Sequence, residues 1–472
     1  MSSRASTLAA NREHSPAQAM VLHCADLLGC GMSFIRAIGR WTMTALVINC
    51  IIGSGIFGVP AELTRLLGRA SPLAMLAAGL VMAIILSCMA EVASQFSEPG
   101  GPYLYMRTAF GRFAGLQVAW FSLLIFTAAP AATTSLFLNY LAGLLPWAGH
   151  GWQRLAMLSV FLLIPTVANC YGVRNGAVLS NLLTIAKLLP LLLLITLGVL
   201  RFVKHFKLID AREITNPGIA AWLSALLLLI FAYGGSESAV IPVGEVKDPR
   251  RTVPFGLFAG LAAATAVYAL IQFVTVATIG ASTTERPLAD TASVLIGAGG
   301  ATFVAIAVMI SAYGRISSTI LNTPRLVSSL ASQGDMPLFL GKLHARFNTP
   351  TTAIVLYAAT LWILAASGTF LWFAELAAAS MIVIYASTCV ALIRLRRQQP
   401  QADALRLPFG HAFAVAGVLI SLALLTRLEA RQALFMVITT LIASANWWWA
   451  HRRASSSGTG RRLSGSLALK KF

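Results

Sequence analysis

Long apolar runs, separated by short polar connectors, make up most of the chain between residues 38 and 450. A run of about 20 apolar residues is long enough to cross the hydrocarbon core of a bilayer as an α-helix. The pattern therefore predicts an all-α integral membrane protein with twelve transmembrane helices. The predicted spans are centred on residues 41–66, 71–97, 113–145, 152–171, 176–200, 217–244, 252–280, 296–330, 351–367, 371–394, 409–427 and 432–450.

Two of the predicted spans are interrupted by flexible residues at corresponding places in the two halves of the chain. The first interruption lies in Ile51–Pro60, around Gly53-Ser54-Gly55, and the second lies in Phe231–Glu237. Unwound backbone is tolerated inside a membrane only where it is buried in protein or lines a cavity. Paired interruptions indicate the binding site of a secondary transporter. A single Gly-x-Gly would fit equally well as a small-residue packing seam between helices.

The backbone groups exposed at such interruptions suit a zwitterion such as an amino acid. The N-terminus of the second half-helix presents free N–H groups and a partial positive charge, so we expect a carboxylate there. The C-terminus of the first half-helix presents free carbonyls, so we expect an ammonium group there. The expected substrate-binding residues of the two interruptions are Ile51, Gly53, Ser54, Gly55, Ile56, Phe231 and Gly234.

Composition supports a membrane protein and excludes other classes. Hydrophobic residues make up 57% of the chain and charged residues 11%, whereas a soluble chain carries roughly a quarter charged residues. The net charge of +19 does not indicate nucleic-acid binding, because the basic residues lie in short loops and tails. The sequence indicates no metal site, no cofactor and no paired catalytic carboxylates. We therefore predict that the protein is not an enzyme.

Lysine and arginine are divided unevenly between the two sides of the membrane. With twelve spans both termini share one side, which carries more than twice as many Lys and Arg as the other. Basic loops stay in the cytoplasm, so we predict a multi-pass plasma-membrane protein with a cytoplasmic N-terminal tail, 1–37, and a basic cytoplasmic C-terminal tail, 451–472. The predicted outer connector, 201–216, opposes this trend because it is itself basic.

The order and spacing of several motifs resemble the amino acid–polyamine–organocation (APC) transporter superfamily, in particular its bacterial-type amino acid permeases and antiporters. The resemblance implies a LeuT-like fold, with a first five-helix repeat at 38–200 and a second, inverted repeat at 217–397. Two peripheral helices would then follow at 398–450. The motifs are Gly53-Ser54-Gly55-Ile56-Phe57, Ala90-Glu91-Val92-Ala93, Pro99-Gly100-Gly101-Pro102-Tyr103, Phe231–Glu237, Gly244–Pro254, Gly334-Asp335-Met336-Pro337 and Phe347-Asn348-Thr349-Pro350.

Charged residues inside predicted spans are functional candidates, since a charge in the bilayer is costly. By resemblance, Lys187 takes the place of a sodium ion and braces the first broken helix. A role in proton coupling and a lysine that extends to the interface are the alternatives. Glu237 would anchor the second broken helix or relay a proton. Glu91 lies near a span end and is expected to be structural.

Arg315 departs from the family pattern, because relatives carry a small residue at this position. Thr319 lies four residues further and shares its helix face, which in relatives looks toward the substrate. An arginine there would repel a cationic side chain and attract an anionic one, or it would pair with Glu237 and leave selectivity unchanged. By resemblance, Phe231 caps the bound substrate, with packing in the bundle core as the alternative.

These features together predict a sodium-independent secondary active transporter. It would move amino acids across the plasma membrane by alternating access, as an exchanger or as a proton-coupled permease. The partners expected are an amino acid, protons and the lipid bilayer, and the sequence gives no oligomeric state. The alternatives are a non-cycling amino acid sensor and a transporter of a related small amine or organic anion.

Overall fold

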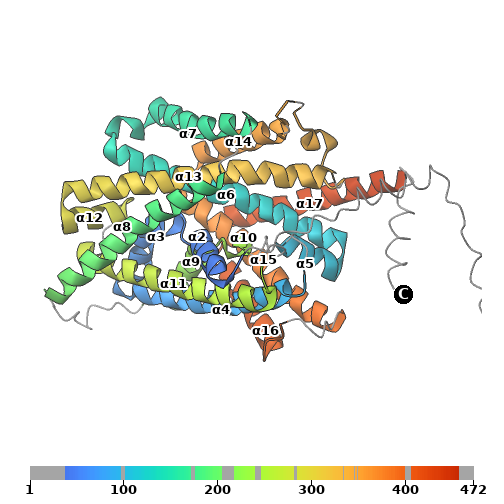
Figure 1. The fold of residues 1–472 in the computed structure, drawn as a ribbon, viewed down its shortest axis with the longest axis horizontal. Coiled ribbons are helices and arrows are strands. Elements are labelled where there is room, and N and C mark those ends of the chain that lie inside the picture. Colours follow the sequence, from blue (N-terminus) through green and yellow to red (C-terminus); the bar gives the residue numbers. More distant parts are fainter. Residues whose placement is uncertain are drawn as a thin grey trace, which may run out of the picture.

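The computed structural model describes most of the chain as a bundle of α-helices (Figure 1). The described residues are 38–96, 101–171, 176–204, 217–239, 246–280, 284–332, 334–344, 346–347, 349–398 and 405–456, and within helices the side chains of 176–187, 204, 237, 249 and 453–456 lie outside the description. The predicted tail 1–37 therefore lies outside the described residues, as does most of the predicted tail 451–472.

The α-helices follow one another along the described chain with an isolated parallel β-bridge between Ile38 and Val246. Their bounds are α2 (Arg40–Ile51), α3 (Gly55–Leu67), α4 (Ser71–Ala93), α5 (Gly101–Phe110), α6 (Arg112–Leu144), α7 (Gly151–Tyr171), α8 (Gly176–Lys204), α9 (Ile219–Tyr233), α10 (Ser236–Ala239), α11 (Pro249–Ile279), α12 (Pro287–Ile296), α13 (Ala298–Ser332), α14 (Thr351–Ser367), α15 (Phe370–Gln398), α16 (Gly410–Leu425) and α17 (Ala430–Ser456). The 3-10 helices are η1 (Gly68–Ala70), η2 (Pro146–Gly149) and η5 (Leu338–Gly341).

Seven helical segments of the described chain are long and apolar enough to cross a membrane. They are Gly55–Ala93, Arg112–Leu144, Gly151–Tyr171, Arg250–Ile279, Ala298–Ser332, Phe370–Gln398 and Ala430–Arg452. Five shorter apolar helical segments of 10–17 residues accompany them: Leu188–Val203, Ile219–Tyr233, Pro287–Ile296, Thr351–Ser367 and Gly410–Leu425. The prediction of an all-helical, multi-pass membrane protein is thus confirmed.

Both predicted interruptions are present. Helix α2 ends at Ile51 and α3 begins at Gly55, so residues 52–54 are not helical. Helix α9 ends at Tyr233 and α10 begins at Ser236, after Gly235 with a φ of +108°. A side chain is strained at that φ, so glycine allows the chain to turn there. The interruptions lie in the middle of the bundle, with α7 and α14 on one side and α16 on the other (Figure 1).

The interior is formed by the long helices that bury most of their apolar surface, α6 and α15, whereas α17 exposes most of its own. Large apolar side chains such as Leu163, Leu419 and Leu441 are exposed on α7, α16 and α17. Exposed apolar side chains of this kind suit contact with lipid, which is itself apolar. The core is therefore enclosed by helices whose outer faces match a bilayer.

Side chains of α2 pack directly against the backbone of α11. A Cβ on Gly256 would overlap the side chain of Met43, and a Cβ on Gly260 would lie 2.6 Å from Cγ1 of Val47. The amide of Lys247, just before α11, also donates a 2.9 Å hydrogen bond to the carbonyl of Ile38, just before α2. Small residues let helix backbones approach closely in membranes, so α2 and α11 form one packed pair.

Two short helices, α5 and α12, lie in stretches that the hydrophobic pattern predicts as connectors. Helix α12 begins at Pro287, has Asp290 in its first turn and ends at Gly297 with a φ of +86°. Proline at the start, an acidic first turn and glycine after the end all favour a helix. These local signals produce helices of ten residues, which are too short to be predicted as membrane spans.

Candidate functional site

The two interrupted helices meet through their backbones. A Cβ placed on Gly55, the first residue of α3, would lie 2.6 Å from the Cα of Ala232 near the end of α9. A Cβ on Gly235, just before α10, would lie 2.5 Å from the carbonyl oxygen of Cys50 near the end of α2. No side chain fits at either place. The structure therefore gives both glycines a packing role and brings the two interruptions of the sequence together.

The contact at Gly55 makes a testable prediction. In Gly55→Ala, the new methyl group would overlap main-chain atoms of α9, which cannot move aside as a flexible side chain can. We expect the apparent melting temperature in detergent to fall, by an amount that corresponds to about 1–3 kcal/mol, and transport to drop with it. The matched control is Gly39→Ala, where a Cβ meets nothing within 4 Å. Equal stability of the two variants would contradict the contact.

The start of α3 leaves backbone donors free. Thr133 on α6 donates its hydroxyl to the carbonyl of Ala129 (2.9 Å), so the 2.8 Å contact between the hydroxyls of Ser54 and Thr133 has Ser54 as donor. The side chain of Ser54 therefore points to α6 and does not cap α3. Within the described chain, the amides of Ser54, Gly55 and Ile56 donate no backbone hydrogen bond. This end of α3 can accept an anion.

Tyr268 on α11 links the two interruptions. Its fully buried hydroxyl lies 2.8 Å from the carbonyl oxygen of Ile51 and 3.0 Å from that of Ala232. The carbonyls belong to the last turns of α2 and α9, where helical partners are lacking. One hydroxyl hydrogen serves two acceptors, so each carbonyl keeps capacity for a further donor.

The aromatic side of the site is closely packed. Phe231 is 6% exposed, and its ring meets that of Phe370 edge to face with centroids 5.9 Å apart. The ring of Phe370 also covers Gly58 on α3, where a Cβ would lie 2.5 Å from it. Gly234 is covered by Met381 in the same way, with a Cβ 2.5 Å from the sulfur. Phe231 and Gly234 thus lie at the junction of α9, α3 and α15.

Arg315 lies beside the first interruption. It is the middle residue of the 35-residue helix α13 and is half-buried. Its Nη1 would lie 3.4 Å from a Cβ placed on Gly53. Its Nε is buried without a hydrogen-bond partner among the described residues. Thr319, one turn further, donates its hydroxyl to the carbonyl of Arg315 at 2.8 Å.

Neither of the two predicted coupling residues has a described side chain. Lys187 belongs to α8 and Glu237 to α10, but the side chains of both lie outside the described residues. Their predicted roles stay predictions, and so does the pairing of Arg315 with Glu237.

Three polar residues at the interruptions escaped the sequence analysis. Tyr268 and Thr133 contact the two breaks as described above. Gln272, one turn after Tyr268, is fully buried and donates through Nε2 to the carbonyl of Pro60 (3.2 Å) and to the hydroxyl of Ser71 (2.8 Å). A signal existed: Tyr268 and Gln272 are polar residues four apart within a long apolar run, and polar residues inside a membrane are functional candidates.

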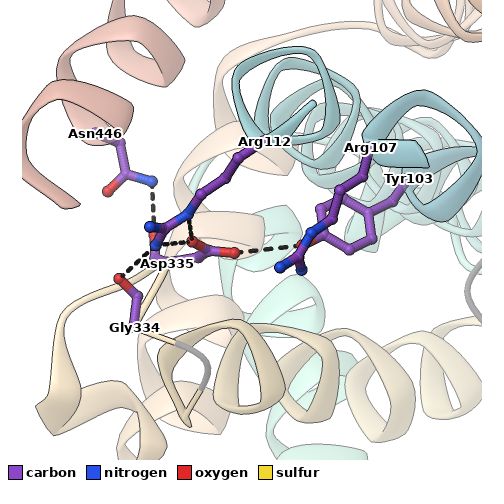
Figure 2. Close-up of polar contacts among 6 residues, drawn as sticks. All are labelled: Tyr103, Arg107, Arg112, Gly334, Asp335 and Asn446. Carbon is purple, nitrogen blue, oxygen red and sulfur yellow. Dashed lines mark hydrogen bonds and ion pairs between the residues drawn. The ribbon is translucent and has the colours of Figure 1, made fainter. Parts of the chain in front are cut away.

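A second polar cluster ties together one end of the bundle (Figure 2). Asp335, in the turn after α13, is 1% exposed and accepts from Arg112 at the start of α6, with Nε 2.8 Å from Oδ1. Tyr103 on α5 donates to Oδ2 at 3.3 Å, and Arg107 donates to the Tyr103 hydroxyl at 2.8 Å. Asn446 on α17 donates to the carbonyl of Asp335 at 2.7 Å. We call these five residues the Asp335 cluster.

Tyr103 is the member of the Asp335 cluster whose pKa is shifted. Burial raises the pKa of the Tyr103 hydroxyl, and the Asp335 carboxylate raises it further, while the charge of Arg107 acts in the opposite direction. The phenol is therefore neutral over the physiological range and remains a donor to Asp335.

A second buried ion pair joins α4 to α15. Glu91 is 0% exposed. Its carboxylate accepts hydrogen bonds from Nε and Nη2 of Arg396, at 2.5 and 2.7 Å. The amide of Leu407, just before α16, also donates to Glu91 at 3.1 Å. A bidentate pair with added backbone donors fixes geometry strongly. The structural role expected for Glu91 is consistent with these contacts.

A cavity of about 510 Å³ opens away from these residues, between α7 and α14. Its lining is mainly apolar and includes Leu162, Leu163 and Trp362, with none of the predicted site residues. Both helices carry exposed apolar side chains, so this hollow belongs to the outer surface of the bundle.

Comparison with known proteins identifies the family. The profile of the amino acid permease family matches residues 38–451. The serine/threonine exchanger SteT of Bacillus subtilis is 26% identical over 395 residues, which cover 81% of this chain and 89% of that protein. The large neutral amino acids transporter small subunit 2 of Oryctolagus cuniculus is 29% identical over 343 residues, which cover 69% of this chain and 63% of that protein. The Asc-type amino acid transporter 1 of Mus musculus is 28% identical over 384 residues, which cover 77% of this chain and 71% of that protein. The chain thus belongs to the amino acid permease family of the APC superfamily, whose members transport amino acids across membranes and are not enzymes.

Proposed function

We propose that this chain is a sodium-independent secondary active transporter that moves amino acids across the plasma membrane by alternating access. The observation that carries the proposal is the meeting of two interrupted helices, with the free amides of Ser54, Gly55 and Ile56 at their junction. Free amides, partly open carbonyls and partial charges of both signs in one place suit a zwitterion.

The substrate carboxylate would bind at the start of α3, where the amides of Ser54, Gly55 and Ile56 have no backbone partner among the described residues. The ammonium group would bind at the carbonyls that end α2 and α9. Tyr268 donates to the carbonyls of Ile51 and Ala232, and each oxygen retains a second lone pair. Tyr268 would thus hold both carbonyl ends at the spacing that the ligand needs.

The fold proposed for this function is the LeuT-like arrangement of twelve spans. The interruptions support it, because they fall in the first span of each proposed repeat, 38–200 and 217–397. The exposed helices α16 and α17 suit the two peripheral spans at 398–450. The remaining proposed segments are the connector 201–216 and the tails 1–37 and 451–472. We propose a cytoplasmic location for the two tails, because basic segments stay in the cytoplasm.

Sodium independence rests on Lys187, which would supply a fixed positive charge where a sodium-coupled relative binds the ion. Glu237 would anchor α10 or carry a proton. Between exchange and proton coupling, we favour exchange, because SteT is a serine/threonine exchanger and matches 81% of the chain. A non-cycling sensor is the main alternative, with a carrier of a small amine or organic anion as the next.

Uptake into proteoliposomes tests the proposal. We expect labelled amino acids to enter vesicles preloaded with unlabelled amino acid, at rates unchanged when choline replaces sodium. Empty vesicles should show little uptake with or without an inward proton gradient. Uptake into empty vesicles that requires the gradient would instead indicate a proton-coupled permease. Binding of an amino acid without uptake in any format would favour the sensor, and sodium-dependent uptake would overturn the role of Lys187.

A further inference from the structure

We propose that Arg315 binds a second negative group of the substrate, so that the transporter carries amino acids with an acidic side chain. This inference rests on the proposed function and specifies the substrate class of the same site. It is carried by a cation at the centre of the bundle whose guanidinium faces the interruption between α2 and α3 and has no anionic partner among the described side chains.

The position of Arg315 favours substrate contact. The guanidinium lies against Gly53, with Nη1 3.4 Å from where a Cβ would be. Gly53 is partly exposed, whereas Ser54 and Gly55 beside it are buried. The guanidinium therefore borders the same backbone that would hold the amino acid.

An arginine at this depth needs an anion. It lies at the middle of a spanning helix, where a charge costs several kcal/mol unless it is paired. The ion pairs of the described chain use Arg65, Arg112, Arg251 and Arg396, and none of them includes Arg315. Its Nε–H is buried and donates to no described group. A bound carboxylate would supply the charge and the acceptor together.

Two anion-binding groups then lie next to each other. The amides that begin at Ser54 form the first, and Arg315 beside Gly53 forms the second. Consecutive Cα atoms are about 3.8 Å apart, so the spacing is that of a short side chain. An aspartate- or glutamate-like substrate would place its α-carboxylate on α3 and its side-chain carboxylate on Arg315. A neutral side chain would leave the guanidinium unpaired, and a cationic one would be repelled.

The test compares acids with their isosteric amides in preloaded proteoliposomes. We expect wild-type protein to take up L-glutamate or L-aspartate about tenfold or more faster than L-glutamine or L-asparagine, since an unpaired buried cation penalises the amide. In Arg315→Gln this preference should disappear, with uptake of the acid falling and that of the amide kept. Arg325→Gln, a control on the same helix whose exposed side chain lies ten residues further on, should keep the preference.

Several results would overturn the inference. A wild-type protein that carries amides as well as acids would sink it while leaving the proposed function intact. An equal loss of acid and amide uptake in Arg315→Gln would show that Arg315 acts on the shared α-carboxylate or on the fold. If that variant does not fold, the ratio of acid uptake to amide uptake, measured for the wild-type protein and for Arg315→Lys, still tests the inference. Absence of any amino acid uptake would be a failure of the proposed function itself.

Discussion

Replacing Arg112 with methionine should be among the most damaging single changes in the chain. Asp335 is 1% exposed and takes two nitrogens of Arg112 as donors. Without them, the buried carboxylate keeps only the 3.3 Å bond from Tyr103 among the described residues. Breaking a buried pair in this way costs about 3–5 kcal/mol. We expect the apparent melting temperature in detergent to fall sharply and little protein to elute as a monodisperse peak.

The reverse change, Asp335→Asn, should be milder. The side chain of Arg112 is 33% exposed, so its charge can reach water when the carboxylate is lost. The double variant Arg112→Met with Asp335→Asn should recover part of the stability lost in Arg112→Met, because it leaves no buried charge behind. Asn446→Ala, which removes one bond to the Asp335 carbonyl, is the control for local damage. Equal melting temperatures for Arg112→Met and Asn446→Ala would contradict the importance of the ion pair.

Tyr268→Phe should reduce transport by about tenfold to a hundredfold while the protein still folds. The change keeps the ring and removes only the hydroxyl that contacts the carbonyls of Ile51 and Ala232. Two buried acceptors then lose their donor, at a cost of about 1–3 kcal/mol. The geometry of the two helix ends would relax at the place where the substrate ammonium is proposed to bind. Initial uptake rates and an apparent melting temperature, measured together, separate the two effects.

Tyr233→Phe provides a closely matched control. Tyr233 is also fully buried and packs edge to face against Tyr268 with centroids 5.1 Å apart. Its hydroxyl donates to the carbonyl of Met75 on α4 and to neither of the carbonyls that Tyr268 contacts. We expect a similar loss of stability in this variant with much less loss of transport. Parallel losses of transport in both variants would show that Tyr268 contributes packing alone.

The sequence predicted the interruptions because their signal is local. Glycine and serine inside an apolar run stand out without knowledge of any neighbour, and α2, α3, α9 and α10 end and begin where the motifs indicated. Helices α5 and α12 were missed because ten residues are too few to read as a span. Their bounds depend on proline and glycine at single positions, which a hydrophobic window averages away.

The contacts that complete the site could not be predicted because they depend on direction and on distant partners. One residue of uncertainty is about 100° around a helix, so the sequence could not show that Tyr268 faces both helix ends. Glu91 was recognisable as a residue near a span end, but its partner Arg396 lies 305 residues away. The reason for glycine at Gly55 also changed, since the structure fills the space of a side chain there with the backbone of Ala232.

The packed pair of α2 and α11 has an evolutionary consequence. Gly256 and Gly260 exist as glycines because Met43 and Val47 occupy the space of their side chains. A larger residue on one helix is tolerable only if its counterpart shrinks, so sizes at positions 43 and 256, and at 47 and 260, should covary inversely across descendants of this sequence. In lineages that lose this compensation, α2 would be free to tilt independently of α11.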